Sequence, residues 1–157
     1  MTITGPWRIR RATTDDADFL ASLAARLTTG RAAWLDEQRM EATMRQFLLD
    51  DLAAMGDTST VFIAEAPDGT PVGAATIERK AHFTGIPQAY LGELAVVAEI
   101  EGQGVGAALL AAAETWAREH GAQIITLETG SANDHARAFF AHQGYGDESV
   151  KLTKVLM

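Results

Sequence analysis

One stretch of the sequence, Glu93 to Leu110, combines residue types that can hold an anion at the start of a helix. It begins as an apolar strand, crosses a loop with glycines at 102, 104 and 106, and continues as an apolar helix. The first N–H groups of a helix lack partners within the helix, and the helix dipole favours negative charge there. Glycines let the backbone approach the anion and adopt the positive φ angles that a nest of N–H groups requires. The stretch therefore predicts a site for phosphate.

The glycine spacing alone does not identify the ligand. Leu109 stands where a dinucleotide-binding G-x-G-x-x-G motif would have its last glycine. A P-loop is also excluded, because no Gly-Lys-Ser or Gly-Lys-Thr follows. The same glycines would equally serve a plain turn between a strand and a helix.

The elements that would position this stretch extend along the whole chain. Alternating apolar residues predict strands, and apolar residues with a helical period predict helices. The expected strands cover 7–11, 60–65, 72–77, 90–97, 123–128, Tyr145 and 150–156. The expected helices lie between Asp16 and Thr28, over roughly 37–55, from the glycine loop to about Glu119, and from Asn133 to Gly144. The 90–128 segment has the length that a parallel crossover requires, so we expect a mixed sheet with helices on its faces.

The helix expected over roughly 37–55 has one apolar and one acidic face. The apolar stripe, expected to be buried, consists of Met40, Met44, Phe47, Leu48, Leu52 and Met55. The acidic face, expected to be solvated, carries Glu37, Glu41, Asp50 and Asp51.

Length and composition limit the possible classes of protein. A chain of 157 residues with 47% apolar residues fits one globular domain over 1–157. The absence of cysteine excludes disulfides, thiolate catalysis and cysteine-based metal sites. The net charge of −8, without a basic cluster, argues against a nucleic-acid partner and suits a cationic substrate, although it also serves solubility alone. With neither a signal-type apolar core nor an apolar run long enough to span a bilayer, we expect a cytoplasmic protein without membrane contact.

Two motifs make the interpretation more specific. The first is Glu93-Leu94-Ala95-Val96, four further residues, then Glu101-Gly-Gln-Gly104-Val-Gly106 and Leu109. The second is Asn133-Asp-His-Ala136-Arg-Ala-Phe139-Phe140-Ala-His-Gln-Gly144-Tyr145. In these motifs, in their order and in the order of strands over nearly the whole chain, the sequence resembles the GNAT superfamily of acyl-CoA-dependent N-acetyltransferases.

The resemblance implies an α/β (α+β) fold and a reaction. The fold would be a mixed, mostly antiparallel sheet of about seven strands with about four helices, splayed between the fourth and fifth strands. The reaction would be transfer of an acetyl group from acetyl-CoA, as co-substrate and without a metal, to a primary amine that attacks directly in a ternary complex. The acceptor would be a small-molecule or peptide amine, and a homodimer is possible because dimers are common in the family.

The resemblance also implies which residues contact CoA. The pyrophosphate would bind to backbone N–H groups of the glycine loop, and the pantetheine arm would pair with the strand at Leu94–Val96, where a backbone N–H near Val96 would polarise the thioester carbonyl. The expected CoA-binding residues are Leu94, Ala95, Val96, Glu101, Gly102, Gln103, Gly104, Val105, Gly106, Ala107, Asn133, Ala136, Phe139 and Phe140. Asn133 would also serve simply as a helix cap.

Because a protonated amine cannot attack, a base must accept a proton, directly or through water. Glu93 is the first candidate, on the strand at the expected cleft, and Glu128 on the partner strand is the second. The alternative interpretation of each residue is an ordinary strand carboxylate without a catalytic role. The histidines at 82, 120, 135 and 142 are weaker candidates. Gly92 suggests a bulge in the strand before Glu93, or a close approach of another group to its backbone, or simply an interruption of the strand pattern.

This sequence departs from the family's pattern at two positions. Glu101 stands where Arg or Gln is usual, so we expect its side chain to turn away from the anion. Phe140 stands where a Tyr often acts as the acid for the departing thiolate, and Phe has no proton to give. Solvent, Ser131 or Tyr145 would take that role, or the thiolate leaves without an acid, since thiols are moderately acidic.

The departures keep a second function open, a non-catalytic acyl-CoA-binding or regulatory module on the same fold. The resemblance places the acceptor site at Thr28–Leu35 and Lys80–Pro87, segments whose residues identify no particular amine.

Overall fold

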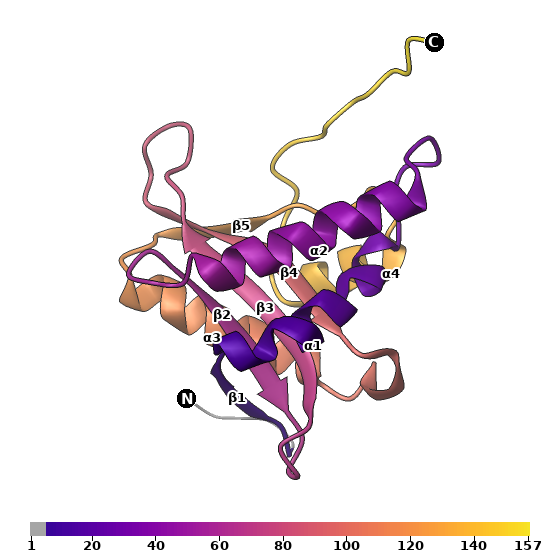
Figure 1. Cartoon of the computed structure of the whole chain (residues 1–157). Coiled ribbons are helices and arrows are strands. Elements are labelled where there is room, and N and C mark those ends of the chain that lie inside the picture. The colour runs from indigo at the N-terminus through magenta and orange to yellow at the C-terminus, as the bar shows by residue number, and fades with distance from the viewer. Residues whose placement is uncertain (1–5) are drawn as a thin grey trace.

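The computed structural model describes residues 6–157, which form one open sheet with helices on both faces (Figure 1). The strands are β1 (Arg8–Arg11), β2 (Ser59–Glu65), β3 (Pro71–Arg79), β4 (Gln88–Val96) and β5 (Ile124–Leu127). The α-helices are α1 (Ala17–Ser22), α2 (Glu37–Ala53), α3 (Val105–Glu119) and α4 (Asp134–His142). Short 3-10 helices occur at η1 (Thr14–Asp16), η2 (Ala24–Thr28) and η3 (Ala98–Ile100).

The five strands lie in chain order across the sheet. The pairs β1–β2, β2–β3 and β3–β4 are antiparallel, and β4–β5 is parallel, connected through α3 as expected. The mixed, mostly antiparallel sheet and the four α-helices agree with the expectation from the sequence. The parallel pairing extends from Gln88 opposite Ile124 to Leu91 opposite Leu127, so the second half of β4 pairs with β3 alone.

The expectation of about seven strands is wrong, because residues 145–157 form no strand in this structure. Val150 and Leu152, from the expected last strand, are 78% and 89% exposed. A strand needs a neighbour for its backbone groups, and the described part of the chain supplies none for this segment.

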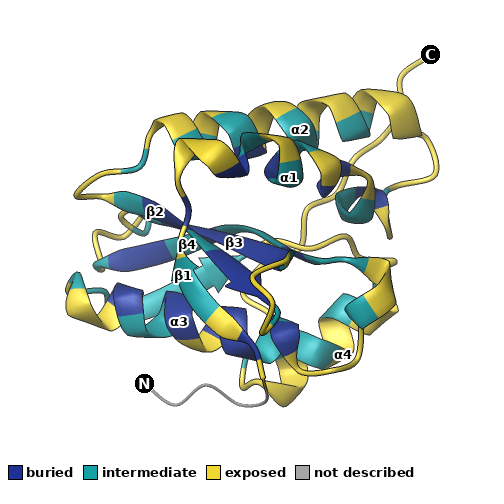
Figure 2. Ribbon diagram, turned by 60° about the horizontal axis from the view of Figure 1, so that its bottom comes forward, coloured by how far each residue is buried: buried dark blue, intermediate teal, exposed yellow. Residues whose placement is uncertain are grey.

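Each face of the sheet carries its own apolar core (Figure 2). On one face, α3 packs Leu109, Leu110 and Trp116 against the sheet, and Phe139 and Phe140 of α4 join this cluster. On the other face, Leu20 and Leu23 from the first helical segment and Leu48 of α2 cover Val61 and Ile63 of β2. None of the helices within residues 6–157 is both long and apolar enough to cross a membrane.

Three helical expectations require correction. The helix expected between Asp16 and Thr28 is divided into η1, α1 and η2. In α2, Leu48 is the buried member of the apolar stripe, whereas Phe47 is 48% exposed. Asp51, expected on the solvated face, is instead partly buried, and its charge acts on Glu93 of β4.

Candidate active site

A β-bulge at the middle of β4 sets the direction of Glu93. The register between β3 and β4 shifts there, since Ile77 pairs with Leu91 but Ala75 pairs with Leu94. Gly92 and Glu93 therefore both lie opposite one residue, Thr76. A bulge of this kind re-aims a side chain, which is why bulges are common beside active sites.

Gly92 and Thr76 are matched in size at this bulge. A Cβ at Gly92 would lie 2.6 Å from the Thr76 hydroxyl oxygen, so a larger residue would displace that hydroxyl. The same oxygen accepts a hydrogen bond of 2.9 Å from the Glu93 N–H. Gly92 thus makes a close approach possible, one of the alternatives that the sequence left open.

The carboxyl of Glu93 lies in a partly buried environment with a second acid. Burial, and then the charge of Asp51, raises the pKa of Glu93 to about 7. Burial also raises the pKa of Asp51 to about 6, against a hydrogen bond from the Thr76 hydroxyl that lowers it. The two carboxyls are coupled, and the charge of Asp51 opposes ionisation of Glu93. A carboxyl with a pKa near neutral pH is suited to exchange protons with an amine.

Glu128, the second base candidate, is exposed at the end of β5. It accepts a hydrogen bond of 3.2 Å from the Tyr90 hydroxyl. Burial raises the pKa of Tyr90 to about 12, and the charges of Glu128, Glu93 and Glu78 add to the shift. Glu128 thus contacts Tyr90 directly, Glu78 lies opposite it on β3, and Glu93 acts on it through its charge.

The glycine loop forms a helix start with free N–H groups. Gly102 and Gly104 have φ angles of +83° and +89°, which a residue with a side chain adopts only under strain. Gly104 is the N-cap of α3 and provides no side chain to cap the first turn. Gly106 has ordinary helical geometry, and a Cβ there would be 3.6 Å from the Phe139 ring, a normal contact. The backbone of this loop has the shape required to bind an anion.

Glu101 is turned toward Arg26 and His135 rather than left alone beside the loop. The Arg26 guanidinium forms an ion pair with its carboxylate, and His135 Nε2 lies 3.5 Å from its other oxygen. Arg26 also donates from Nε to the Val96 carbonyl oxygen at 3.0 Å. Arg26 of η2 therefore links the end of β4 to Glu101, the residue before the glycine loop. Its positive charge offsets the negative charge of Glu101, which would otherwise repel an anion bound at the loop.

The second motif forms α4 and its approach. Asn133 is the N-cap of α4, accepting from the Ala136 N–H at 3.1 Å, and its amide donates to the Thr29 carbonyl at 3.3 Å. Phe140 packs edge-to-face against Phe139. The capping role of Asn133 is therefore present, and its pantetheine role remains a prediction.

Tyr145 and the histidines make local contacts. The Tyr145 hydroxyl donates to Glu114 at 2.7 Å, and burial raises its pKa. His82 lies 3.0 Å from Glu148, while His120 stacks on Trp116. His142 is exposed at the end of α4, as is Ser131 in the loop before that helix. Within residues 6–157, no group of three or more acidic or histidine side chains could hold a metal ion.

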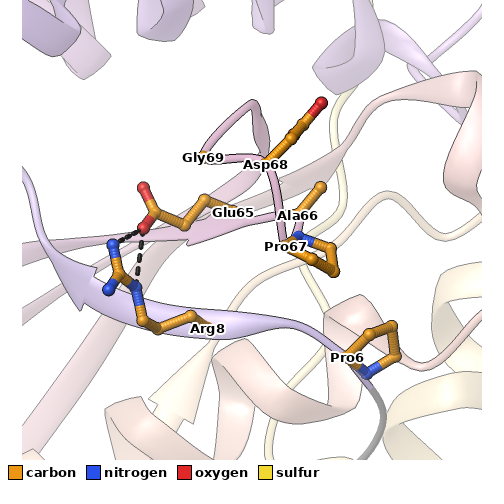
Figure 3. A pocket seen from close by; sticks show the side chains of 7 residues that line it. All are labelled: Pro6, Arg8, Glu65, Ala66, Pro67, Asp68 and Gly69. Atoms are coloured by element: carbon orange, nitrogen blue, oxygen red, sulfur yellow. Dashed lines mark hydrogen bonds and ion pairs between the residues drawn. The ribbon is translucent and has the colours of Figure 1, made fainter.

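A hollow of about 470 Å³ lies elsewhere, at the end of β2 (Figure 3). Two carboxylates line it. Glu65 is already paired with Arg8 and Arg10, which lowers its pKa, and hydrogen bonds from Thr70 lower the pKa of Asp68. A carboxylate held in this way has no capacity left to accept a proton near neutral pH, so we assign no chemistry to this hollow.

The sequence singled out Glu93 and the glycine loop as candidates but did not point to three residues near them, Thr76, Asp51 and Arg26. Thr76 is a single hydroxyl in an apolar strand, and Asp51 belongs to a helix face that is otherwise acidic and solvated. Arg26 lies 75 residues before its partner Glu101. The sequence held one signal for Arg26. Glu101 places a negative charge beside an expected anion site, and such a charge predicts a nearby cation.

Comparisons with known proteins show similarity over most of the chain. A sequence profile described as the acetyltransferase (GNAT) family matches residues 23–145. The chain is 28% identical to an aminoalkylphosphonate N-acetyltransferase of Salmonella typhimurium, covering 94% of this chain and 90% of that protein. It is 31% identical to an aminoglycoside N(6′)-acetyltransferase type 1 of Stenotrophomonas maltophilia, covering 91% and 87%.

The fold is also found among solved structures. The aminoglycoside N-acetyltransferase AAC(6′)-Iy, in complex with the bisubstrate analogue CoA-S-monomethyl-acetylneamine, superposes with a TM-score of 0.72. The match covers 98% of this chain and 100% of that one, at 19% identity, and therefore establishes a shared architecture.

Proposed function

The chain belongs to the acetyltransferase (GNAT) family, and on that premise we propose that it transfers an acetyl group from acetyl-CoA to the nitrogen of a small cationic amine. The observation that carries this proposal is Glu93, a partly buried carboxyl with a pKa of about 7 on a bulged strand. A purely structural strand carboxyl would gain nothing from burial beside a second acid, since burial disfavours its charged form.

Glu93 acts as the base in this proposal, directly or through one water. The incoming amine is protonated at neutral pH and must lose a proton before it attacks. The Glu93 carboxylate accepts this first proton. A C–N bond to the acetyl carbon then forms, the C–S bond breaks and CoA leaves as the thiolate, while the second proton, from the nitrogen of the new amide, passes to solvent. The thiolate leaves without a tyrosine acid, because Phe140 occupies that position of the motif and the Tyr145 hydroxyl is engaged by Glu114.

The second half of β4 and the start of α3 hold CoA. Pairing between β4 and β5 ends at Leu91, and a splay beyond that point would open Leu94–Val96 to the pantetheine arm. A backbone N–H near Val96 would polarise the thioester carbonyl. The pyrophosphate lies against backbone N–H groups between Gly102 and Ala107, apart from the Gln103 N–H, which donates to the Ile100 carbonyl. Three features support this fit: two glycines at positive φ, an uncapped first turn, and a Glu101 carboxylate held by Arg26.

Acidic side chains favour a cationic acceptor. Glu78, Glu93 and Glu128 all act on Tyr90 through their charge, and Asp51 lies beside Glu93. The two named relatives act on an aminoalkylphosphonate and an aminoglycoside. Because four carboxyl groups repel a phosphonate and attract a polyamine, an amine of the second kind suits this chain better.

The test is CoA release from acetyl-CoA with a panel of polyamines, aminoglycosides, aminoalkylphosphonates and lysine peptides, with mass spectrometry of the product. We expect stoichiometric release of CoA and acetylated product with a cationic amine. Glu93→Gln should lower kcat/KM by about 10²–10⁴-fold, while Glu99→Gln, an exposed acid beyond β4, should have little effect. Tight CoA binding with no turnover on any amine would instead indicate a non-catalytic acyl-CoA-binding module.

A further inference from the structure

Thr76 of β3 places a buried hydroxyl at the point where β4 bulges. The residue is 3% exposed, and the bulge sets both Gly92 and Glu93 opposite it. Its oxygen accepts a hydrogen bond of 2.9 Å from the Glu93 N–H. Because a bulge disrupts the regular ladder of backbone hydrogen bonds, the Thr76 side chain supplies an acceptor that fixes the backbone of Glu93.

Asp51 of α2 contacts the same hydroxyl from the other side. The Thr76 hydroxyl donates its proton to the Asp51 carboxylate. The point where a Cβ of Gly92 would lie is 2.6 Å from the hydroxyl oxygen and 3.8 Å from Asp51 Oδ2, so these groups meet over the bulge. A hydroxyl has one proton to donate and lone pairs that accept. When Asp51 takes the proton, a lone pair is left for the Glu93 N–H, so Asp51 orients the hydroxyl.

Apolar packing holds Asp51 in this position. The helix α2 covers one face of the sheet (Figure 2), and Leu48, about one turn before Asp51, is 1% exposed in the core cluster with Val61 and Ile63 of β2. Residues three apart lie on the same side of a helix, so burial of Leu48 directs Asp51 toward the sheet. Burial raises the pKa of Asp51 to about 6, which means that the fold keeps a carboxyl here at a cost in stability.

Other titratable groups surround Asp51 and Glu93 on α2 and on the strands. They are Asp50 of α2, Glu78 of β3, Lys80 just after β3, Tyr90 of β4 and Glu128 of β5. The charge that adds to burial in raising the pKa of Glu93 is that of Asp51. Replacing the Asp51 carboxyl by an amide should therefore change the ionisation of Glu93, whereas the same replacement at Asp50 should not.

On the premise of the proposed function, in which Glu93 is the base, we propose that Thr76 and Asp51 are positioning residues for acetyl transfer. Asp51 orients the Thr76 hydroxyl, and this hydroxyl fixes the bulge that presents the Glu93 carboxyl to the acceptor. Neither residue contacts the reacting atoms. Asp51 has a second effect, because its negative charge sets the pH above which Glu93 is ionised and able to accept a proton.

The hydroxyl is tested with Thr76→Val, which keeps the branched shape of the side chain. We expect kcat to fall roughly ten- to hundredfold, because the base is misplaced, with the KM for acetyl-CoA unchanged. The Glu93 amide should also exchange its hydrogen faster. Thr76→Ser keeps the hydroxyl and should restore both properties. The matched control is Thr60→Val, since Thr60 is a buried threonine of β2 whose hydroxyl has no hydrogen-bond partner within residues 6–157.

The charge is tested with Asp51→Asn, which keeps a carbonyl oxygen for the Thr76 hydroxyl. Carbon-13 NMR of the Glu93 carboxyl should give a midpoint near pH 7 in the natural chain. In Asp51→Asn the midpoint should be roughly one pH unit lower, and the rising limb of kcat/KM should move with it. Asp50→Asn should leave both where they are. A higher KM for the amine with an unmoved midpoint would show that Asp51 binds the acceptor, and would overturn the proposal.

Two further results would also overturn it. One is a Thr76→Val chain that keeps the natural kcat and a protected Glu93 amide. The other is a Thr76→Ser chain, folded by circular dichroism, that restores neither property. The exchange and NMR measurements need no turnover. If the natural chain acetylates no amine, the proposed function fails, while these two measurements still decide whether Thr76 and Asp51 hold Glu93.

Discussion

At the scale of single residues, the main departure from the family's pattern, Glu101, is offset by Arg26. A carboxylate beside a pyrophosphate site weakens anion binding unless a cation neutralises it. Arg26 does so while also donating to the Val96 carbonyl, and His135 approaches the other oxygen. Both partners of the ion pair are more than one third exposed, so the expected effect is modest.

Substitutions at this ion pair should change CoA affinity in opposite directions. Arg26→Gln leaves the Glu101 charge unpaired and should weaken CoA binding by about two- to fivefold, the range of an exposed ion pair. Glu101→Gln should strengthen it by a similar factor, and the double variant should lie between the two. Titration calorimetry with CoA measures all three. Equal affinities in every variant would show that Glu101 faces solvent without influence on the site.

Phe140 makes a separate prediction about the leaving group. Its ring packs against Phe139 and Tyr145, edge-to-face in both cases, within the core cluster of α3 and α4. If the thiolate leaves without an acid, Phe140→Tyr should leave kcat at saturating amine within about twofold, because thiols are already moderately acidic. A rise of tenfold or more, measured by steady-state kinetics, would show that proton donation limits the natural enzyme.

At the scale of elements, two glycines bring the segment after η2 against the loop before α4. Gly30 has a φ of +78°, and a Cβ there would lie 2.4 Å from the Asn133 Cβ. A Cβ at Gly130 would lie 2.3 Å from the Gly30 carbonyl oxygen. This contact fixes the N-cap of α4 relative to the first helical segment, and thus one end of the expected CoA site.

Gly30→Ala should therefore destabilise the protein more than a glycine substitution with the same backbone angle elsewhere. Gly121 is the matched control, with a φ of +80° and no atom within 4 Å of the added Cβ. Gly121→Ala should cost about 1–2 kcal/mol for the positive φ alone. Gly30→Ala should cost roughly 1–3 kcal/mol more for overpacking against Asn133. Urea denaturation measures the difference, and equal losses would mean that the contact is loose.

The elements were predicted well where local pattern decides them and poorly where a partner decides them. The β3–β4 region, α3 and α4 follow from apolar periodicity, glycines and the Asn133 cap, all of which are local. The bulge at Gly92 was only suggested, because its cause is the Thr76 side chain on another strand. The prediction of a strand over 150–156 was wrong for a related reason. The alternation of apolar and polar residues there shows strand character, but a strand also needs a neighbouring strand, which the pattern does not supply.

At the scale of the whole molecule, two partly buried acids make stability fall as pH rises. The pKa of Glu93 is raised from 4.5 to about 7, and that of Asp51 from 3.8 to about 6. The folded chain thus holds protons that the unfolded chain releases, and this contribution is lost as pH rises through the folded-state pKa values. Asp16 and Glu65 act oppositely, because arginine partners lower their pKa and they lose stability in acid.

Glu93→Gln should therefore stabilise the fold in a manner that depends on pH. The gain in the free energy of unfolding over the natural chain should be small near pH 4.5 and should grow until pH exceeds about 7. Denaturant titrations at several pH values measure this. A gain that does not change with pH would mean that Glu93 ionises as an ordinary exposed carboxyl.

The most direct measurement of the central claim is the pH profile of kcat/KM for acetyl transfer, in the natural chain and in Glu93→Gln. If Glu93 is the base, kcat/KM of the natural chain should rise with pH through a pKa near 7. In Glu93→Gln this step should be absent and the plateau about 10²–10⁴-fold lower. A variant that keeps both the step and the rate of the natural chain would contradict the assignment of Glu93 and move the base elsewhere.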